Sequence, residues 1–206
     1  MRMRVALLAG IVLCAASAGL AKSEHIAPTG DWRPVVTPAD VTRLHGWRDA
    51  FVKGLAEARA GGFEAEPAKE GALLDPDSAI DGAALPAGSY RCRTIKLGSQ
   101  GDGGLAFVSY PAFDCRVTAD GAVSRFVRLN GSQRPTGTLY RASIRQQVFL
   151  GTLVLGDETR ALTYGRDNDR NMVGAVQRIG ANRWRLVLPY PRFESTLDVM
   201  ELVPAS

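Results

Sequence analysis

The sequence predicts a mainly β protein: an antiparallel meander of eight or nine strands, preceded by one amphipathic helix. From residue 89 onward, short apolar runs alternate with turn signals rich in Gly, Asn and Asp. This spacing is typical of β-barrels and β-sandwiches. No segment between these runs has the length and periodicity of a crossover helix, which excludes a parallel α/β sheet.

Residues 1–21 have the anatomy of a signal peptide. Two arginines precede an apolar run, and small residues follow, so cleavage is expected after Ala18 or Ala21. The sequence therefore predicts a periplasmic or secreted protein. A lipoprotein anchored through Cys14 is the less favoured alternative, because Leu13 stands where such sites usually have a small residue.

The charge balance gives no basis for nucleic-acid binding. The chain has 25 basic and 21 acidic residues, two of the arginines belong to the predicted signal peptide, and the others are scattered. After signal removal no stretch is long and apolar enough for a transmembrane segment.

Residues 22–36 are expected to form an extended leader, and residues 37–61 an amphipathic helix. Thr37 is a suitable N-cap and Pro38 suits the first helical position. The apolar stripe that defines the helix consists of Val41, Leu44, Trp47, Phe51 and Leu55. The other face mixes both charge signs, which favours packing on the protein's own domain over binding to a membrane surface.

Residues 62–88 form a connector rich in Pro and Gly, and residues 89–206 form the antiparallel β-domain. Pro111 interrupts the second expected strand, which predicts an edge or a bulge there, and residues 131–137 are expected to be a turn. A small closed or partly open, lipocalin-like barrel is favoured, because closure leaves no free strand edges. The expected strands are 90–97, 107–118, 123–129, 138–140, 147–155, 161–164, 172–179, 183–188 and 196–203.

Cys92 and Cys115 lie in the first two expected strands and are the two thiols left after signal removal. In an oxidising compartment they are expected to form a disulfide. A metal pair or a redox dithiol is less favoured, because the spacing is not C-x-x-C and no histidine is nearby.

Several local patterns run from residue 31 to the C-terminus. They are D-W-R at 31–33, E-G-A-L-L-D-P at 70–76, Y-R-C-R at 90–93, G-S-Q-R-P at 131–135, F-L-G-T-L at 149–153 and the closing run 184–195. Together they resemble an uncharacterised bacterial family, domain of unknown function 4893. The resemblance implies one domain and brings no activity with it.

The usual catalytic groups are scarce. His25 lies in the leader and His45 in the helix, and there is no G-x-S-x-G motif. Both mature cysteines are expected to be oxidised, and too few ligands remain for zinc. No catalytic residue, metal or cofactor is therefore predicted.

Two polar loops and one turn supply the candidate binding residues. The aspartates of the loop 166–171 superficially resemble calcium ligands, but the glycine and the distant glutamate of an EF-hand are missing and two arginines neutralise the cluster. A solvated, self-paired loop is the simpler interpretation. The candidates are Arg134, Arg166, Asp167, Asp169, Arg170, Tyr190, Arg192 and Glu194.

Two functions from different classes remain open. The favoured one is a non-enzymatic binding module for a protein partner or a small ligand. The alternative is an envelope hydrolase-like enzyme that uses carboxylates and arginines. An open apolar cavity would favour binding of a small ligand, two convergent acids in a cleft would favour the enzyme, and a filled barrel interior would exclude the small ligand.

Overall fold

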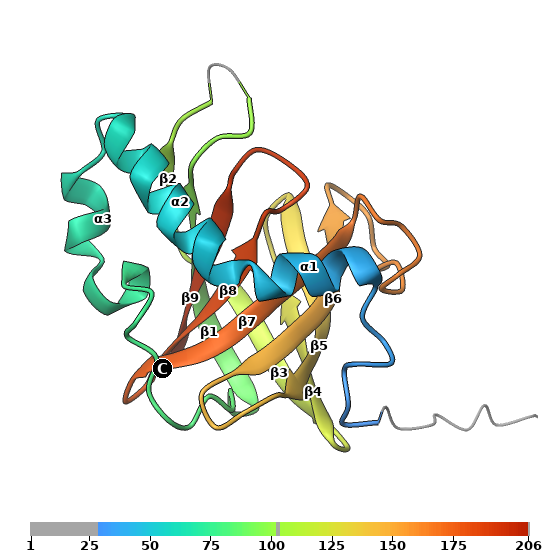
Figure 1. Cartoon of the computed structure of the whole chain (residues 1–206). Coiled ribbons are helices and arrows are strands. Elements are labelled where there is room, and N and C mark those ends of the chain that lie inside the picture. Colours follow the sequence, from blue (N-terminus) through green and yellow to red (C-terminus); the bar gives the residue numbers. More distant parts are fainter. Residues whose placement is uncertain (1–28, 102–103, 206) are drawn as a thin grey trace, which may run out of the picture.

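A closed antiparallel barrel of eight strands forms the centre of the molecule (Figure 1). The computed structural model describes residues 29–101 and 104–205, so the predicted signal peptide, Cys14 and His25 lie outside the described residues. Pairing of the last strand with the first closes the barrel, which confirms the predicted fold class. The barrel strands are β1 (Gly88–Leu97), β3 (Phe113–Asp120), β4 (Val123–Arg128), β5 (Gln133–Arg141), β6 (Gln147–Leu155), β7 (Asn171–Gly180), β8 (Arg183–Pro189) and β9 (Leu197–Pro204).

The second predicted strand is divided in two. Strand β2 (Phe107–Ser109) pairs with the C-terminal end of β1, and β3 pairs with its N-terminal part. Pro111 lies in the break between them, as the missing proline donor predicts.

Two expectations for the strands are wrong. Strand β5 begins at Gln133, inside the predicted turn 131–137, and it includes Pro135. Strand β5 pairs with β4 only as far as Thr136. Pro135 lies beyond this pairing, so its missing N–H breaks no backbone hydrogen bond to β4. Residues 161–164 form no strand and belong to the β6–β7 connection, where the Tyr164 hydroxyl accepts from the Thr37 backbone nitrogen and donates to Asp40.

The helical segment predicted for 37–61 is divided at Gly46 into α1 (Pro38–His45) and α2 (Trp47–Ala60). Figure 1 shows both helices lying across the outside of the barrel. Phe51 of α2 packs with apolar residues of β1, β8 and β9, and Leu44 of α1 packs with residues of β6 and β7. The helical segment therefore covers its own barrel, as its mixed polar face predicted.

The connector also packs on the barrel. It contains α3 (Ala65–Lys69) and the 3₁₀ turn η1 (Gly71–Leu74). Leu73 and Leu74 of η1 are buried against the same outer face as α2.

One half of the barrel interior is a filled core. The predicted disulfide between Cys92 and Cys115 lies in this core, with both cysteines buried and their Cα atoms 6.0 Å apart. The rings of Phe126 and Phe149 meet edge to face there, with their centroids 5.9 Å apart. This core ends where the other half of the interior opens into a cavity.

An ion network holds the connector on the outer face of β1. Arg93 of β1 donates from Nη1 to Glu70 at 2.8 Å and from Nε to Glu201 at 3.0 Å, and Arg183 also donates to Glu201 at 2.6 Å. The hydrogen bond from Arg93 holds the pKa of Glu70 below its usual value near 4.5.

This network predicts a pH dependence of stability. A carboxyl group whose pKa is lower in the folded state stabilises the protein above its unfolded-state pKa, and the stabilisation is lost as the pH falls through the folded-state value. Glu70→Gln is expected to reduce the free energy of unfolding by about 1–2 kcal/mol at neutral pH and to lose less stability on acidification than the wild type. Urea titrations between neutral pH and about pH 3 measure both effects.

Asp81→Asn is the matched control, because the Asp81–Arg145 pair is exposed on the surface, with a distance of 2.7 Å. Its expected cost is below about 0.5 kcal/mol. Equal pH profiles for wild type and Glu70→Gln would contradict the role given to Glu70.

Candidate functional site

A cavity of about 290 Å³ occupies the half of the barrel interior nearest the β4–β5, β6–β7 and β8–β9 connections. Most of its wall is apolar. The apolar wall includes Phe113, Pro135, Leu153, Met172, Leu188 and Met200, and the polar residues in the interior are Thr94, Lys96, Arg128, Gln133 and Asp198.

Strand alternation explains why these side chains share the interior. Side chains at every second position of a strand lie on the same face. Thr94 and Lys96 follow the buried Cys92 at intervals of two, and Asp198 has the same relation to Met200.

Two carboxylates converge on Lys96 in the cavity wall. The Lys96 ammonium lies 2.6 Å from Glu194 and 3.9 Å from Asp198, and the hydroxyl of Ser195 donates to Asp198 at 2.5 Å. Burial opposes the charge on Lys96, but the two carboxylates outweigh burial and raise its pKa. The cluster therefore has one ammonium group for two carboxyl groups, and burial favours the uncharged form of Asp198.

The two carboxyl groups have opposite pKa shifts. Burial raises the pKa of Asp198, although Lys96 and the Ser195 hydroxyl oppose this effect. The hydrogen bond from Lys96 lowers the pKa of Glu194. Carboxyl groups whose pKa values are driven apart are also a feature of acid–base pairs in enzymes.

Ion pairs join the loops around the cavity. Arg192 of the β8–β9 connection lies 2.8 Å from Asp169 of the β6–β7 connection. Arg170 binds Glu158 through both terminal nitrogens, at 3.0 and 3.2 Å, and also donates to the Leu153 carbonyl. The Arg192–Asp169 pair therefore links two loops at the cavity mouth, whereas the Arg170–Glu158 pair lies within the β6–β7 connection.

The cavity wall includes the cations Lys96, Arg128, Arg170 and Arg192, and helix α1 contributes a fifth, Arg43. Arg43 pairs with Asp40 and donates to the carbonyls of Tyr190 at 3.2 Å and Asn171 at 3.0 Å. Burial and the bond to Asp40 raise the pKa of Tyr164 to about 12. These contacts fix the start of the helical layer against the barrel end.

The structure brings four of the eight candidate residues to this end of the barrel. Asp169, Arg170 and Arg192 line the cavity, and Glu194 binds Lys96.

The other four lie outside the cavity. Arg134 donates to three backbone carbonyls of two surface loops, and Arg166 is exposed. Asp167 accepts a hydrogen bond from the Asp169 backbone nitrogen within its own loop. Tyr190 packs with the outer cluster beneath α2. Over residues 29–101 and 104–205, no group of three potential metal-ligating side chains gathers in space.

The interior polar residues Thr94, Lys96, Arg128 and Asp198 were not among the sequence candidates. They lie inside strands rather than in loops. Alternation along the strand could have identified Thr94 and Lys96. Both lie an even number of residues after Cys92, so all three side chains are on the same face of the strand.

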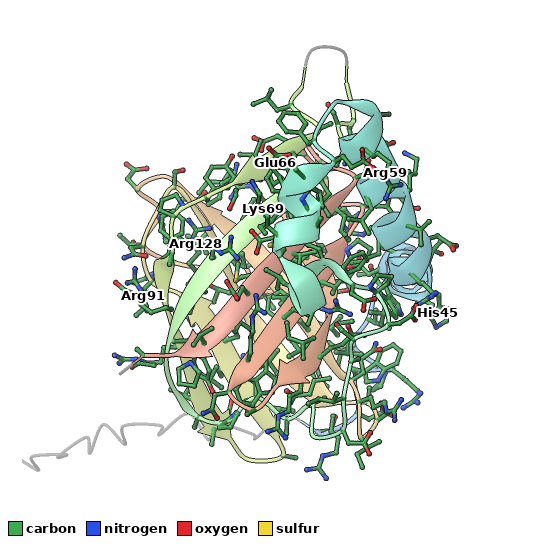
Figure 2. All side chains as sticks on the ribbon, turned by 90° about the vertical axis from the view of Figure 1, so that its left-hand side faces the viewer. His45, Arg59, Glu66, Lys69, Arg91 and Arg128 are labelled. Carbon is green, nitrogen blue, oxygen red and sulfur yellow. A yellow bond between two sulfur atoms is a disulfide. The ribbon has the colours of Figure 1, made fainter. Side chains whose placement is uncertain are left out.

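In Figure 2, His45 is labelled at the edge of the molecule beside the helices, and Arg128 is labelled on the side of the barrel away from α2. His45 is exposed, as expected for a helix surface residue. Within the part of the chain that the structure describes, no helix is long and apolar enough to cross a membrane.

Comparisons with known proteins agree with the local sequence patterns. Residues 32–202 match the family described as domain of unknown function, DUF4893. Neither the comparison with curated proteins nor the comparison with solved structures gives a match. Because the family match spans most of the barrel and the helical layer, the chain belongs to the DUF4893 family.

Proposed function

We propose that this protein is a non-enzymatic binding protein of the cell envelope, and that it holds a small amphipathic molecule in the open half of its barrel. The observation that supports this proposal is the cavity of about 290 Å³, whose wall is mainly apolar with a few polar groups. Small-molecule sites typically have this composition, and small barrels are wide enough for one such ligand. The location in the envelope is supported by the signal-peptide pattern and by the disulfide.

The disposition of the charged groups favours binding over catalysis. Glu194 and Asp198 both face the ammonium of Lys96, and Asp198 also accepts the Ser195 hydroxyl. Their charges are thus used in contacts within the protein. The charges at the cavity mouth are also paired within the protein, Arg170 with Glu158 and Arg192 with Asp169.

A hydrolase remains the second candidate because the pKa values of Asp198 and Glu194 shift in opposite directions. Chromogenic ester and glycoside substrates distinguish the two functions. Turnover that disappears in Glu194→Gln and Asp198→Asn would replace the binding proposal.

The proposal predicts that filling the cavity abolishes ligand binding. Leu153 points into the cavity from β6, so Leu153→Trp places an indole ring in the ligand volume. Isothermal titration with octanol is expected to show saturable binding to the wild type and at least about tenfold weaker binding to Leu153→Trp.

Native mass spectrometry of protein from the periplasmic fraction would show the retained ligand, the cleaved leader and the disulfide.

Val203→Trp is the matched control, because Val203 is 37% exposed near the end of β9 and does not line the cavity. It is expected to bind octanol as the wild type does. The absence of saturable binding to the wild type, or equal binding by the two tryptophan variants, would contradict a ligand site inside the barrel.

A further inference from the structure

Arg128 is a buried cation inside the cavity. Arg128 is the last residue of β4, is only 8% exposed and lines the cavity wall. Its Nε donates to the carbonyl of Asn130 at 3.0 Å, and its guanidinium carbon lies 3.5 Å from the centroid of the Phe113 ring. These two contacts orient the guanidinium group but supply no negative charge.

The other cations of the cavity wall differ from Arg128 in this respect. Each has a carboxylate partner: Arg43 has Asp40, Lys96 has Glu194, Arg170 has Glu158 and Arg192 has Asp169. Among the described residues Arg128 has no carboxylate within ion-pair distance. In the described part of the chain it is therefore the cation of this wall that has no ion-pair partner.

An unbalanced buried charge is costly. Burial, and to a smaller extent the positive charge of Arg134, lower the pKa of Arg128 to about 10. Removing a cation from water is unfavourable unless an anion and hydrogen-bond acceptors replace the lost hydration. A ligand with a negative group would supply both to Arg128.

Thr94 provides a second, independent observation. It is 6% exposed, it lines the same cavity from β1, and its hydroxyl oxygen has no hydrogen-bond partner among the described residues. Buried hydroxyl groups nearly always have a partner. The hydroxyl of Thr94 is thus available to a polar group of a molecule in the cavity.

We propose that the ligand is a small amphiphile with a monoanionic carboxylate headgroup, bound by the guanidinium of Arg128 with its apolar part against Leu153, Met172 and Met200. This inference rests on the proposed ligand site and adds the chemical class of the ligand. Guanidinium groups bind carboxylates through two parallel hydrogen bonds. One unbalanced cation matches one negative charge, whereas a dianionic phosphate would need a second cation, and the others are already paired.

The test compares three probes of one chain length: octanoate, octanol and octylamine. By isothermal titration the wild type is expected to bind octanoate about 10- to 100-fold more tightly than octanol, the range for a hydrogen-bonded ion pair. Arg128→Gln is expected to bind octanoate no more tightly than octanol and to leave octanol binding unchanged.

Two further variants complete the experiment. Arg125→Gln removes the same charge from the same strand, but Arg125 is exposed and pairs with Asp120. This control is expected to bind octanoate as the wild type does. Thr94→Val removes the unpartnered hydroxyl without changing the charge and is expected to weaken octanoate binding about 3- to 10-fold, so the proposal stays testable if Arg128→Gln does not fold.

The outcomes separate this inference from the proposed function. If octanoate and octanol bind equally and Leu153→Trp abolishes both, the carboxylate headgroup is wrong and the barrel ligand site stands. If octylamine binds most tightly, the headgroup is cationic and Glu194 and Asp198 are its partners. If no probe binds, the ligand site itself is wrong, and the inference is lost with it.

Discussion

Replacing Arg185 with methionine is expected to reduce the free energy of unfolding by at least about 3 kcal/mol. Arg185 lies on the outer face of β8, is completely buried, and donates to Gln177 at 2.9 Å. Its guanidinium carbon lies 4.9 Å from the centre of the Phe51 ring of α2. Its terminal nitrogens donate at 2.5–3.2 Å to the backbone carbonyls of Ala72, Leu73, Asp75 and Pro76.

This arginine joins the connector to the barrel. The last carbonyls of a helical turn need donors from outside it. Arg185 donates to the Ala72 and Leu73 carbonyls of η1, and the Ser78 hydroxyl also donates to Ala72. Burial lowers the pKa of Arg185 to about 10, opposed by the charges of Asp75 and Asp77. Methionine has a similar length but no donor. The carbonyls of Ala72 and Asp75 would keep the hydrogen bonds from Ser78, but those of Leu73 and Pro76 would lose the donor that Arg185 supplies. Each strongly buried carbonyl left unpaired costs about 1–3 kcal/mol.

Arg134→Met is the matched control. Arg134 also donates to three backbone carbonyls, at 2.5–2.8 Å, but its bonds lie at the exposed surface of two loops, where water replaces a lost donor. Its expected cost is below about 1 kcal/mol. Urea unfolding measures both variants, and hydrogen exchange of residues 71–78 shows whether the connector detaches first. Equal costs for the two substitutions would show that burial of Arg185 does not determine its contribution.

The strands themselves could be predicted well from the sequence. Strands β6 and β8 nearly coincide with their predicted ranges, because alternating or continuous apolar runs with glycine-containing turns define them locally. The errors occur where contacts with distant parts of the chain determine the local structure. Pro135 is tolerated because the β4–β5 pairing ends at Thr136. Tyr164 forms a hydrogen bond with Thr37, far away in the sequence. The local sequence pattern contains no information on either contact.

The candidate site was predicted less completely. Loop residues such as Asp169, Arg170 and Arg192 stand out in the sequence because loops at the end of a barrel often carry binding groups. A charged residue within a strand is ordinarily assigned to the solvent face, and this expectation conceals Lys96, Arg128 and Asp198. The burial of both faces in parts of β1, β8 and β9 depends on how the helices cover the barrel.

Removing the disulfide is expected to cost about 3 kcal/mol. The bond joins residues 23 positions apart, and in the chain-entropy model closing a loop of this length restricts the unfolded chain by about that amount. The replacement Cys92→Ala with Cys115→Val keeps much of the buried volume and removes the cross-link. Reversible urea unfolding gives the loss, provided that the folded spectrum of the variant resembles that of the wild type.

A reductant separates the cross-link from the packing. Wild-type protein unfolded in the presence of dithiothreitol should lose its cross-link and approach the stability of the double variant, whereas the double variant should be unaffected. Both sulfurs are buried beside Trp184 and Leu202 in the filled half of the barrel, so any stability difference that persists between the two proteins in reductant measures side-chain packing. If reductant leaves the unfolding midpoint of the wild type unchanged at equilibrium, the cross-link does not stabilise the folded state. The filled half of the barrel would then depend on apolar packing alone.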